Sequence, residues 1–308
     1  MNNKTLAITF GVLLLIYLLV KFAGGNRDRS FDPEIMSIDT SLVNKVEVRP
    51  SNDEPFTLQK SAGAWTVSVG GKTYEAASQS VQSLLANMIS IKADRIVSKN
   101  PDKFADYNVN DSLGTFITLY SGTNPLGDLV VGRFSFNQAT RNGISYLKHP
   151  DKDEVYSVDG FLSMSLSQDY TNYRNKEMLS LAKDALTKID LNMDGEVYTF
   201  SKGASSWRVN NLAVDSSSMA TYLSTLGNVS GASFVENPTT EMGSQLGQVA
   251  FEGNNILQPI QVLAYAAQDT TQDFILHSSL NEDAYFYSDS SGIYNRVFGK
   301  LLDLVDGE

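Results

Sequence analysis

Apolar and polar side chains alternate along several short runs of the chain, and one set of runs occurs twice. Alternation with a period of two residues places every second side chain on the same face of a strand. The two sets occupy residues 42–67 and 185–209, and each contains a Lys-[Val/Ile]-[Glu/Asp]-[Val/Leu] run, a Thr-[Leu/Phe]-x-Lys run and a tryptophan followed by x-Val. Because an internal repeat determines the whole fold, the sequence predicts two copies of one unit.

Each copy continues with apolar residues at helical spacing, and the positions i, i+3, i+4 and i+7 predict one buried face. The serines that precede both stripes predict N-caps. An Asn-Pro pair then ends each passage from helix to strand, because the residue before proline avoids the α region. The first copy has Ser78 or Ser80, then Val81, Leu84, Leu85, Met88, Ile91 and Asn100-Pro101; the second has Ser216 to Ser218, then Met219, Tyr222, Leu223, Leu226 and Asn237-Pro238.

Further β-forming runs and a short amphipathic stretch, residues 161–166 or 293–304, complete each copy. Residues 121–127 form a turn by composition, and short turns favour antiparallel meanders. The predicted fold class is α+β: two tandem β-rich repeats, each a mostly antiparallel sheet with one packed amphipathic helix, after an N-terminal transmembrane helix. The predicted domains are an anchor at 1–25, a tether at 26–37, repeat 1 at 38–170 and repeat 2 at 171–308.

The N-terminal segment, residues 6–23, is almost entirely apolar. At about 1.5 Å per residue such a helix spans roughly 26 Å, close to the hydrocarbon thickness of a bilayer. A cleaved signal peptide and a buried core helix are the alternatives, but residues 21–25 fit a cleavage site poorly and a polar linker follows. We expect a retained single-pass anchor that contacts the lipid bilayer through residues 6–23.

The side of the membrane on which the body lies is less directly encoded. Lys21, Arg27 and Arg29 follow the segment and only Lys4 and the terminal amine precede it, so the positive-inside rule favours a cytoplasmic body. Short N-terminal anchors before Ser/Thr/Asn-rich domains commonly translocate them, and on this ground we expect a periplasmic body at a bacterial inner membrane.

Composition narrows the possible chemistry. The 308 residues contain no cysteine, which excludes disulfides, thiolate zinc sites and cysteine nucleophiles. The formal net charge is -11, and the first 25 residues contribute two lysines and no acid. A body this acidic repels phosphate backbones, so we expect no nucleic-acid partner.

Two short motifs suggest catalysis or phosphate binding, but the other motifs that such sites require are absent. Ser180-Leu181-Ala182-Lys183 matches the S-x-x-K of penicillin-recognising serine enzymes, but the partner motifs S-D-N and K-T-G are absent. Gly122 and Gly127 have the spacing of a phosphate loop without the Lys-Ser/Thr pair, and Asp128 would repel the anion. We interpret these segments as a surface stretch and a hairpin turn.

The remaining polar clusters also favour structural roles. Asp151, Asp153 and Glu154 lack the glycine and distal glutamate of a calcium loop, and Asp190, Asp194 and Glu196 surround a predicted hairpin tip at Gly195. The only histidines, His149 and His277, occupy matching places and raise the possibility of one symmetric metal site, although repeat inheritance explains the match. Trp65 and Trp207 are stacking platforms or core anchors, and their repetition favours the core. We assign no catalytic, cofactor-binding or metal-binding residue.

The paired strands Lys45–Val48 and Lys188–Leu191, with the Thr-x-x-Lys and Trp-x-Val runs, resemble the bacterial DUF4340 family. Residues 173–179 resemble its recurrent R-[DN]-[KR] stretch, with residues 27–29 as the counterpart in the first copy. Tyr107-Asn108-Val109 departs from a Tyr-Gly-Leu turn in relatives. The resemblance implies an N-terminal membrane anchor, brings no catalytic residue, and associates relatives with ABC-type transport components of the gliding-associated kind.

The expected function is therefore that of a non-enzymatic, membrane-anchored cell-envelope module that contacts a membrane-protein partner, plausibly ABC-type transporter components, and requires no cofactor. The alternative is a binder of a small molecule or glycan in a cleft between the repeats. A hydrolase using Ser180 and Lys183 is the third hypothesis.

Overall fold

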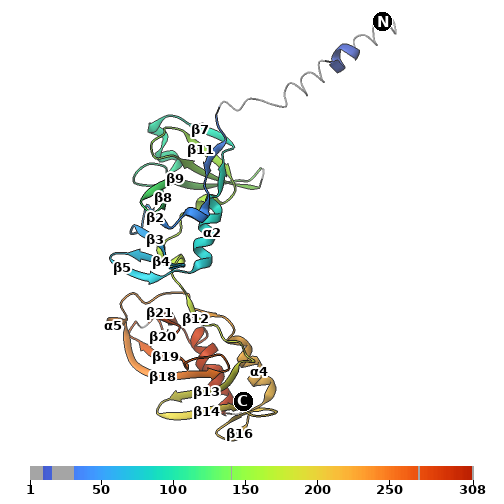
Figure 1. The fold of residues 1–308 in the computed structure, drawn as a ribbon, viewed down its shortest axis with the longest axis vertical. Coiled ribbons are helices and arrows are strands. Elements are labelled where there is room, and N and C mark those ends of the chain that lie inside the picture. Colours follow the sequence, from blue (N-terminus) through green and yellow to red (C-terminus); the bar gives the residue numbers. More distant parts are fainter. Residues whose placement is uncertain (1–9, 16–30, 140, 270, 307–308) are drawn as a thin grey trace. The chain divides into compact units, whose positions relative to one another are not determined.

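The computed structural model describes residues 10–15, 31–139, 141–269 and 271–306. Two large antiparallel sheets and few helices give a β-rich α+β fold (Figure 1). Backbone contacts divide the chain into two compact units, Met1–Thr57 with Gln82–Gln168 and Leu58–Val81 with Asp169–Glu308.

The first large sheet has nine strands in the order β5-β4-β3-β2-β8-β9-β10-β11-β7. Its strands are β2 (Lys45–Arg49), β3 (Phe56–Ser61), β4 (Ala64–Val69), β5 (Lys72–Glu75), β7 (Arg95–Ser98), β8 (Thr115–Ser121), β9 (Asn124–Asn137), β10 (Asn142–Lys148) and β11 (Val155–Asp159). A separate pair joins β1 (Glu34–Ser37) to β6 (Ser90–Lys92). The helices of this part of the chain are α2 (Ser78–Met88) and α3 (Leu162–Leu166), with 3-10 turns at Thr40–Leu42, Pro101–Lys103 and Ala105–Tyr107.

The second large sheet has eight strands in the order β16-β15-β14-β13-β18-β19-β20-β21. Its strands are β13 (Leu186–Met193), β14 (Glu196–Lys202), β15 (Trp207–Val209), β16 (Leu212–Ala213), β18 (Met242–Gly253), β19 (Ile260–Ala267), β20 (Phe274–Ser278) and β21 (Asn281–Ser288). A separate pair joins β12 (Glu177–Leu179) to β17 (Val229–Ser230). The helical segments are a 3-10 turn at Tyr170–Asn172, α4 (Ser216–Thr225), α5 (Pro238–Glu241), a π-helical turn η6 (Asn295–Gly299) and α6 (Lys300–Asp306).

The two sheets follow the same strand order apart from β7 at the edge of the first. In each of them β2 or β13 lies between the hairpin strand that follows it and β8 or β18. The ladders also agree in register. Val46 lies opposite Leu119, and Ile189 lies opposite both Phe251 and Phe200. The small sheets agree too, since β1 pairs with β6 as β12 pairs with β17, each with one bulge.

Three local predictions differ from the structure. The helix predicted to include Ile91 ends at Met88, and Ile91 is buried in β6 instead. The turn predicted at 121–127 is much tighter, because Asn124 already pairs with Ser121 at the start of β9. The predicted tether at 26–37 contains β1, whose apolar residues are buried, so its last residues belong to the fold. The repeat boundaries at 38–170 and 171–308 stay a prediction.

Both Asn-Pro pairs stand at the start of a helical turn, in addition to ending the segment between helix and strand that precedes them. Asn100 has an extended backbone, with φ of -101°, and its side chain accepts a hydrogen bond from the Asp102 amide. Pro238 likewise occupies the first turn of α5. Proline suits this position because its missing N–H would have no partner inside the helix.

Each large sheet has a buried face that the principal helix helps to cover. The stripe of α2 is buried as predicted, and in α4 Met219, Tyr222 and Leu223 are buried in one cluster with strand residues such as Phe251. The N-cap of α4 is Asp215, one residue before the predicted serine caps. Its side chain accepts a hydrogen bond from the Ser218 amide. Both tryptophans are buried, which confirms their predicted role as core anchors.

The predicted membrane anchor lies mostly outside the described residues. Residues 10–15 are helical, and their large apolar side chains, among them Phe10 and Leu15, are exposed. No helix among the described residues is both long and apolar enough to cross a membrane.

Candidate functional site

The repeated Lys-x-[Glu/Asp] motif forms a surface ion pair in both copies. Lys45 Nζ lies 2.8 Å from Glu47 Oε1, and the Tyr120 hydroxyl donates to the other carboxylate oxygen at 2.9 Å. Residues i and i+2 lie on the same strand face, so the spacing of the motif brings the two charges together. The hydrogen bond from Lys45 lowers the pKa of Glu47, and the bond to Glu47 raises the pKa of Tyr120.

The second copy repeats this arrangement with another partner. Lys188 Nζ lies 2.6 Å from Asp190 Oδ2 and 3.1 Å from Glu252 Oε1, while the Thr199 hydroxyl also donates to Asp190. These hydrogen bonds raise the pKa of Lys188, so the amine stays protonated. A protonated lysine satisfied by two carboxylates is a poor nucleophile or base. The bond from Lys188 to Glu252 joins β13 to β18.

Arg174, from the R-[DN]-[KR] stretch, is the most buried cation of the second unit, with only 3% of its side chain exposed. Its guanidinium lies 3.8 Å from the ring centroid of Tyr74 and 3.7 Å from that of Phe234. Glu236 Oε1 accepts from its Nη1 at 2.8 Å. Stacking on two rings and one charged hydrogen bond compensate the guanidinium for lost hydration, so this side chain is structural.

The first copy has no arginine at the place of Arg174. The hydrogen bond from the Glu34 amide to Asp32 matches the bond from the Glu177 amide to Asn175. Phe31 therefore occupies the equivalent position, where its ring packs 6.0 Å from Tyr156. The predicted counterpart at residues 27–29 lies outside the described residues.

The catalytic and phosphate motifs do not converge with other functional groups. Ser180 and Lys183 are exposed between β12 and β13, and neither lines a described pocket. Gly122 adopts a left-handed conformation at the β8–β9 turn, with φ of 64°, whereas Gly127 lies within β9.

The acidic clusters lie at turns between strands. Asp194 and Gly195, with φ of 53° and 84°, form the two-residue turn of the β13–β14 hairpin, as the sequence predicts. Glu154 pairs with Lys99 at 3.3 Å, and Asp151 and Asp153 are exposed in the β10–β11 turn. No group of three or more histidine or acidic side chains arranged for a metal ion occurs in the described parts of the chain.

The two histidines are not equivalent. When the strand pairs are counted outward from the equivalent residues Lys45 and Lys188, Val130 of β9 corresponds to Leu263 of β19. Lys148 lies opposite Val130, and His277 lies opposite Leu263. His277 therefore corresponds to Lys148, and His149 lies one residue further on. A shift of one residue in a strand exchanges its faces, so the register does not make His149 and His277 a symmetric pair.

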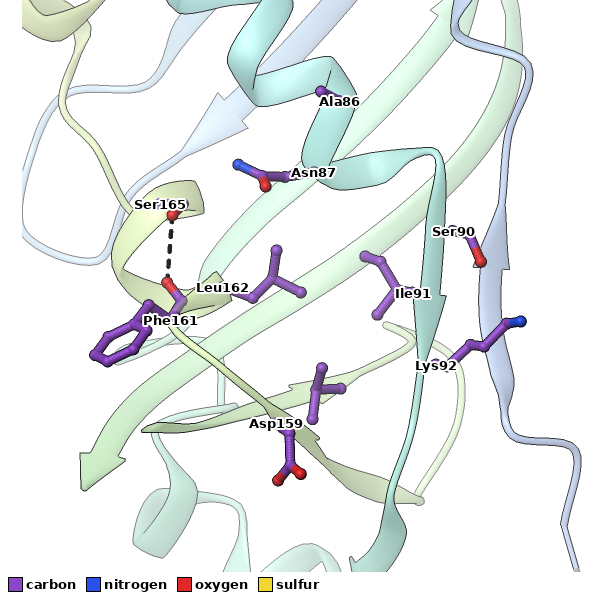
Figure 2. Close-up of a pocket in the computed structure, with 10 residues that line it drawn as sticks. Ala86, Asn87, Ser90, Ile91, Lys92, Asp159, Phe161, Leu162 and Ser165 are labelled. Atoms are coloured by element: carbon purple, nitrogen blue, oxygen red, sulfur yellow. Dashed lines mark hydrogen bonds between the residues drawn. The ribbon is translucent and has the colours of Figure 1, made fainter. Parts of the chain in front are cut away.

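A groove in the first unit has a volume of about 440 Å³ (Figure 2). We call it the α2–α3 groove. It lies between the last turn of α2, β6, the end of β11 and α3, and Ile91 and Leu162 extend toward each other across it in Figure 2. Lys92 and Asp159 are its charged residues; Lys92 extends to the β1 side, where Glu34 lies opposite it in the ladder.

The rim of this groove exposes an aromatic side chain. Phe161, which lines the groove, is 54% exposed and stacks on Phe134 at 5.2 Å between ring centroids. The α3 backbone is held by Ser145, whose hydroxyl accepts from the Ser163 amide at 2.8 Å and donates to Gly160 O at 3.1 Å. The groove thus has an exposed aromatic side chain at its rim, next to a short helix whose start is fixed by Ser145.

These features define an α+β protein built from two similar antiparallel sheets. A family model described as "Domain of unknown function (DUF4340)" matches residues 65–248, and the chain belongs to this family. No curated protein and no solved structure matches the chain. Asn108 has φ of 56°, a left-handed conformation that asparagine tolerates well.

Proposed function

We propose that this protein is a non-enzymatic, single-pass module of the bacterial cell envelope that binds a membrane-protein partner, plausibly a component of an ABC-type transport system. The apolar segment at 6–23 is the anchor, and the body lies on the periplasmic side of the inner membrane. The observation that carries the proposal is the α2–α3 groove with the exposed Phe161 at its rim. Exposed apolar rims next to a fixed groove are typical of protein contact sites.

Two further observations support a binding role. The two charged side chains of each repeated motif form an ion pair with each other within one strand. These pairs are Lys45 with Glu47 and Lys188 with Asp190. The body is strongly acidic, which favours a partner with basic groups.

The direct test is chemical crosslinking in intact cells, followed by membrane fractionation and affinity purification of the full chain. We expect the chain in the membrane fraction, crosslinked to a defined membrane protein. A strictly monomeric chain without a crosslinked partner, or a chain recovered in the soluble fraction, contradicts the proposal. A C-terminal reporter that is active only in the periplasm tests the orientation, and an inactive reporter contradicts it.

The alternative is a binder of a small molecule or glycan. The volume of the α2–α3 groove, about 440 Å³, lies within the range of ligand sites, and this observation favours the alternative as a second candidate. A cleft between the two repeats stays a prediction from the sequence.

A further inference from the structure

The two copies differ at the segment that closes each of them. After β11 the first copy has only α3, five residues without a basic side chain. After β21 the second copy has η6 followed by α6, and Val297, Phe298 and Leu301 of this closing segment are fully buried in the core of the unit. In the second copy the closing segment contacts α4, whereas in the first copy the end of α2 and α3 line a groove.

The equivalent residues can be assigned from the small sheets. Glu34 lies opposite Lys92 and Met36 opposite Ile91, just as Glu177 lies opposite Ser230 and Leu179 opposite Val229. The helices α2 and α4 precede these strands at the same spacing, and their buried stripes coincide. Asn87 thus corresponds to Thr225, and Ser90 corresponds to Asn228.

In the second copy these positions hold a cation. Arg296 Nη2 donates to the carbonyl oxygens of Thr225 and Asn228, both at 2.8 Å. The last carbonyls of a helix have no partner within the helix and carry a partial negative charge, so a guanidinium is well suited to them. In the first copy the equivalent residues Asn87 and Ser90 line the α2–α3 groove (Figure 2).

We propose that the α2–α3 groove binds an arginine presented by an amphipathic helix of a partner protein, with the guanidinium on the carbonyl oxygens of Asn87 and Ser90. The apolar residues beside the arginine contact Phe161 and Leu162, which line the groove. Asp159 adds a negative charge to the groove. This inference rests on the proposed function and specifies the chemistry of its partner. The pattern expected in the partner helix is that of Arg296, Val297 and Phe298, an arginine followed by apolar residues.

The probe is a labelled peptide with the sequence of residues 292–306, titrated into the full chain. Binding by fluorescence anisotropy is compared for the peptide and its Arg296→Gln form. On the protein, Ala86→Trp fills the groove, and Ser224→Trp is the matched control, because Ser224 is the equivalent exposed position of α4. Asp159→Lys reverses the charge at the groove.

We expect the dissociation constant to rise about tenfold or more for the Arg296→Gln peptide, for Ala86→Trp and for Asp159→Lys, and to be unchanged for Ser224→Trp. Absent binding, or binding insensitive to these changes, overturns the inference. Arginine amide that competes as well as the whole peptide also overturns it, because the groove then recognises a small guanidinium compound. If crosslinking in cells still yields a membrane-protein partner after Ala86→Trp, the groove assignment fails while the proposed function stands.

Discussion

Ala62 adopts a left-handed backbone conformation, with φ of 50°, in the two-residue turn between β3 and β4. An L-residue other than glycine or asparagine is disfavoured there, because its Cβ approaches the following carbonyl. Gly63, the second residue of the turn, has φ of 90°. Asn-Gly is the preferred pair for such a hairpin turn.

Ala62→Asn is therefore expected to raise the free energy of unfolding by about 0.5–1 kcal/mol. Urea denaturation followed by circular dichroism measures the change. Lower stability in the variant would show that the turn does not select its residues in this way.

Arg174 illustrates a residue whose motif was visible in the sequence while its role was not. Its guanidinium stacks between Tyr74 and Phe234 and donates to Glu236. Arg174→Ala removes these contacts and leaves a cavity, and we expect a loss of about 3 kcal/mol in the free energy of unfolding. Arg208→Ala, at an exposed position of β15, is the control and is expected to change stability by less than about 0.5 kcal/mol. Equal effects of the two substitutions in urea denaturation would contradict a structural role for Arg174.

Tyr287 provides a prediction about pH. Its hydroxyl donates to Glu241, and this hydrogen bond, with burial second, raises the pKa of Tyr287 from 10.0 to about 12. A raised pKa in the folded state means that the contribution to stability is complete below pH 10 and is lost as the pH rises through 12. We expect the stability difference between the wild type and Tyr287→Phe to be constant up to pH 10 and to shrink above it, measured by urea denaturation at each pH. A difference that persists unchanged to pH 12 would refute the linkage.

At the scale of elements, the closing segment of the second unit is held by Arg296. Its two hydrogen bonds to the end of α4 are charge-assisted, and the Tyr222 hydroxyl adds a bond to Val297 O at 3.1 Å. Arg296→Met is expected to cost about 2 kcal/mol and to accelerate amide hydrogen exchange in α6 more than in β13. Lys300→Met, one turn later, is the control. Uniform acceleration across the unit would show that Arg296 does not act through the closing segment.

The elements that the sequence predicted are those with strong apolar periodicity. The stripes of α2 and α4 and the repeated lysine strands lie where the spacing placed them. The missed elements are short or mostly polar. In β5, for example, no residue is buried, so its pairing with β4 leaves no alternation to recognise. Ile91 was assigned to a helix because its spacing also fits a helical face, and tertiary pairing with Met36 decided otherwise.

The groove could not be predicted from the repeat alone. Its recognition groups are backbone carbonyls, which leave no trace in the identity of Asn87 or Ser90. One signal was available: the closing stretch at 293–304 contains Arg296 and Lys300, whereas that at 161–166 contains no basic residue. The difference between the copies, more than their similarity, indicates where a partner fits.

At the scale of the whole molecule, duplication has preserved strand order and core in both copies while the closing segments diverged. The matched tryptophans and ion-paired lysines are explained by the fold. The anchor, the periplasmic side and the transporter association are proposals that the sequence motivates. Together with the inference about the groove, they lead to one consequence, that a membrane protein contacts the first unit at the α2–α3 groove.

Site-specific photocrosslinking in intact cells tests this consequence most directly. A photoreactive residue is placed at Ser165, which lines the groove, or at Ser224 of α4 as the matched control, in the full chain. The account predicts a discrete crosslinked species in the membrane fraction from Ser165 and none from Ser224. Equal crosslinking from both positions, or no membrane-bound adduct from Ser165, would contradict it.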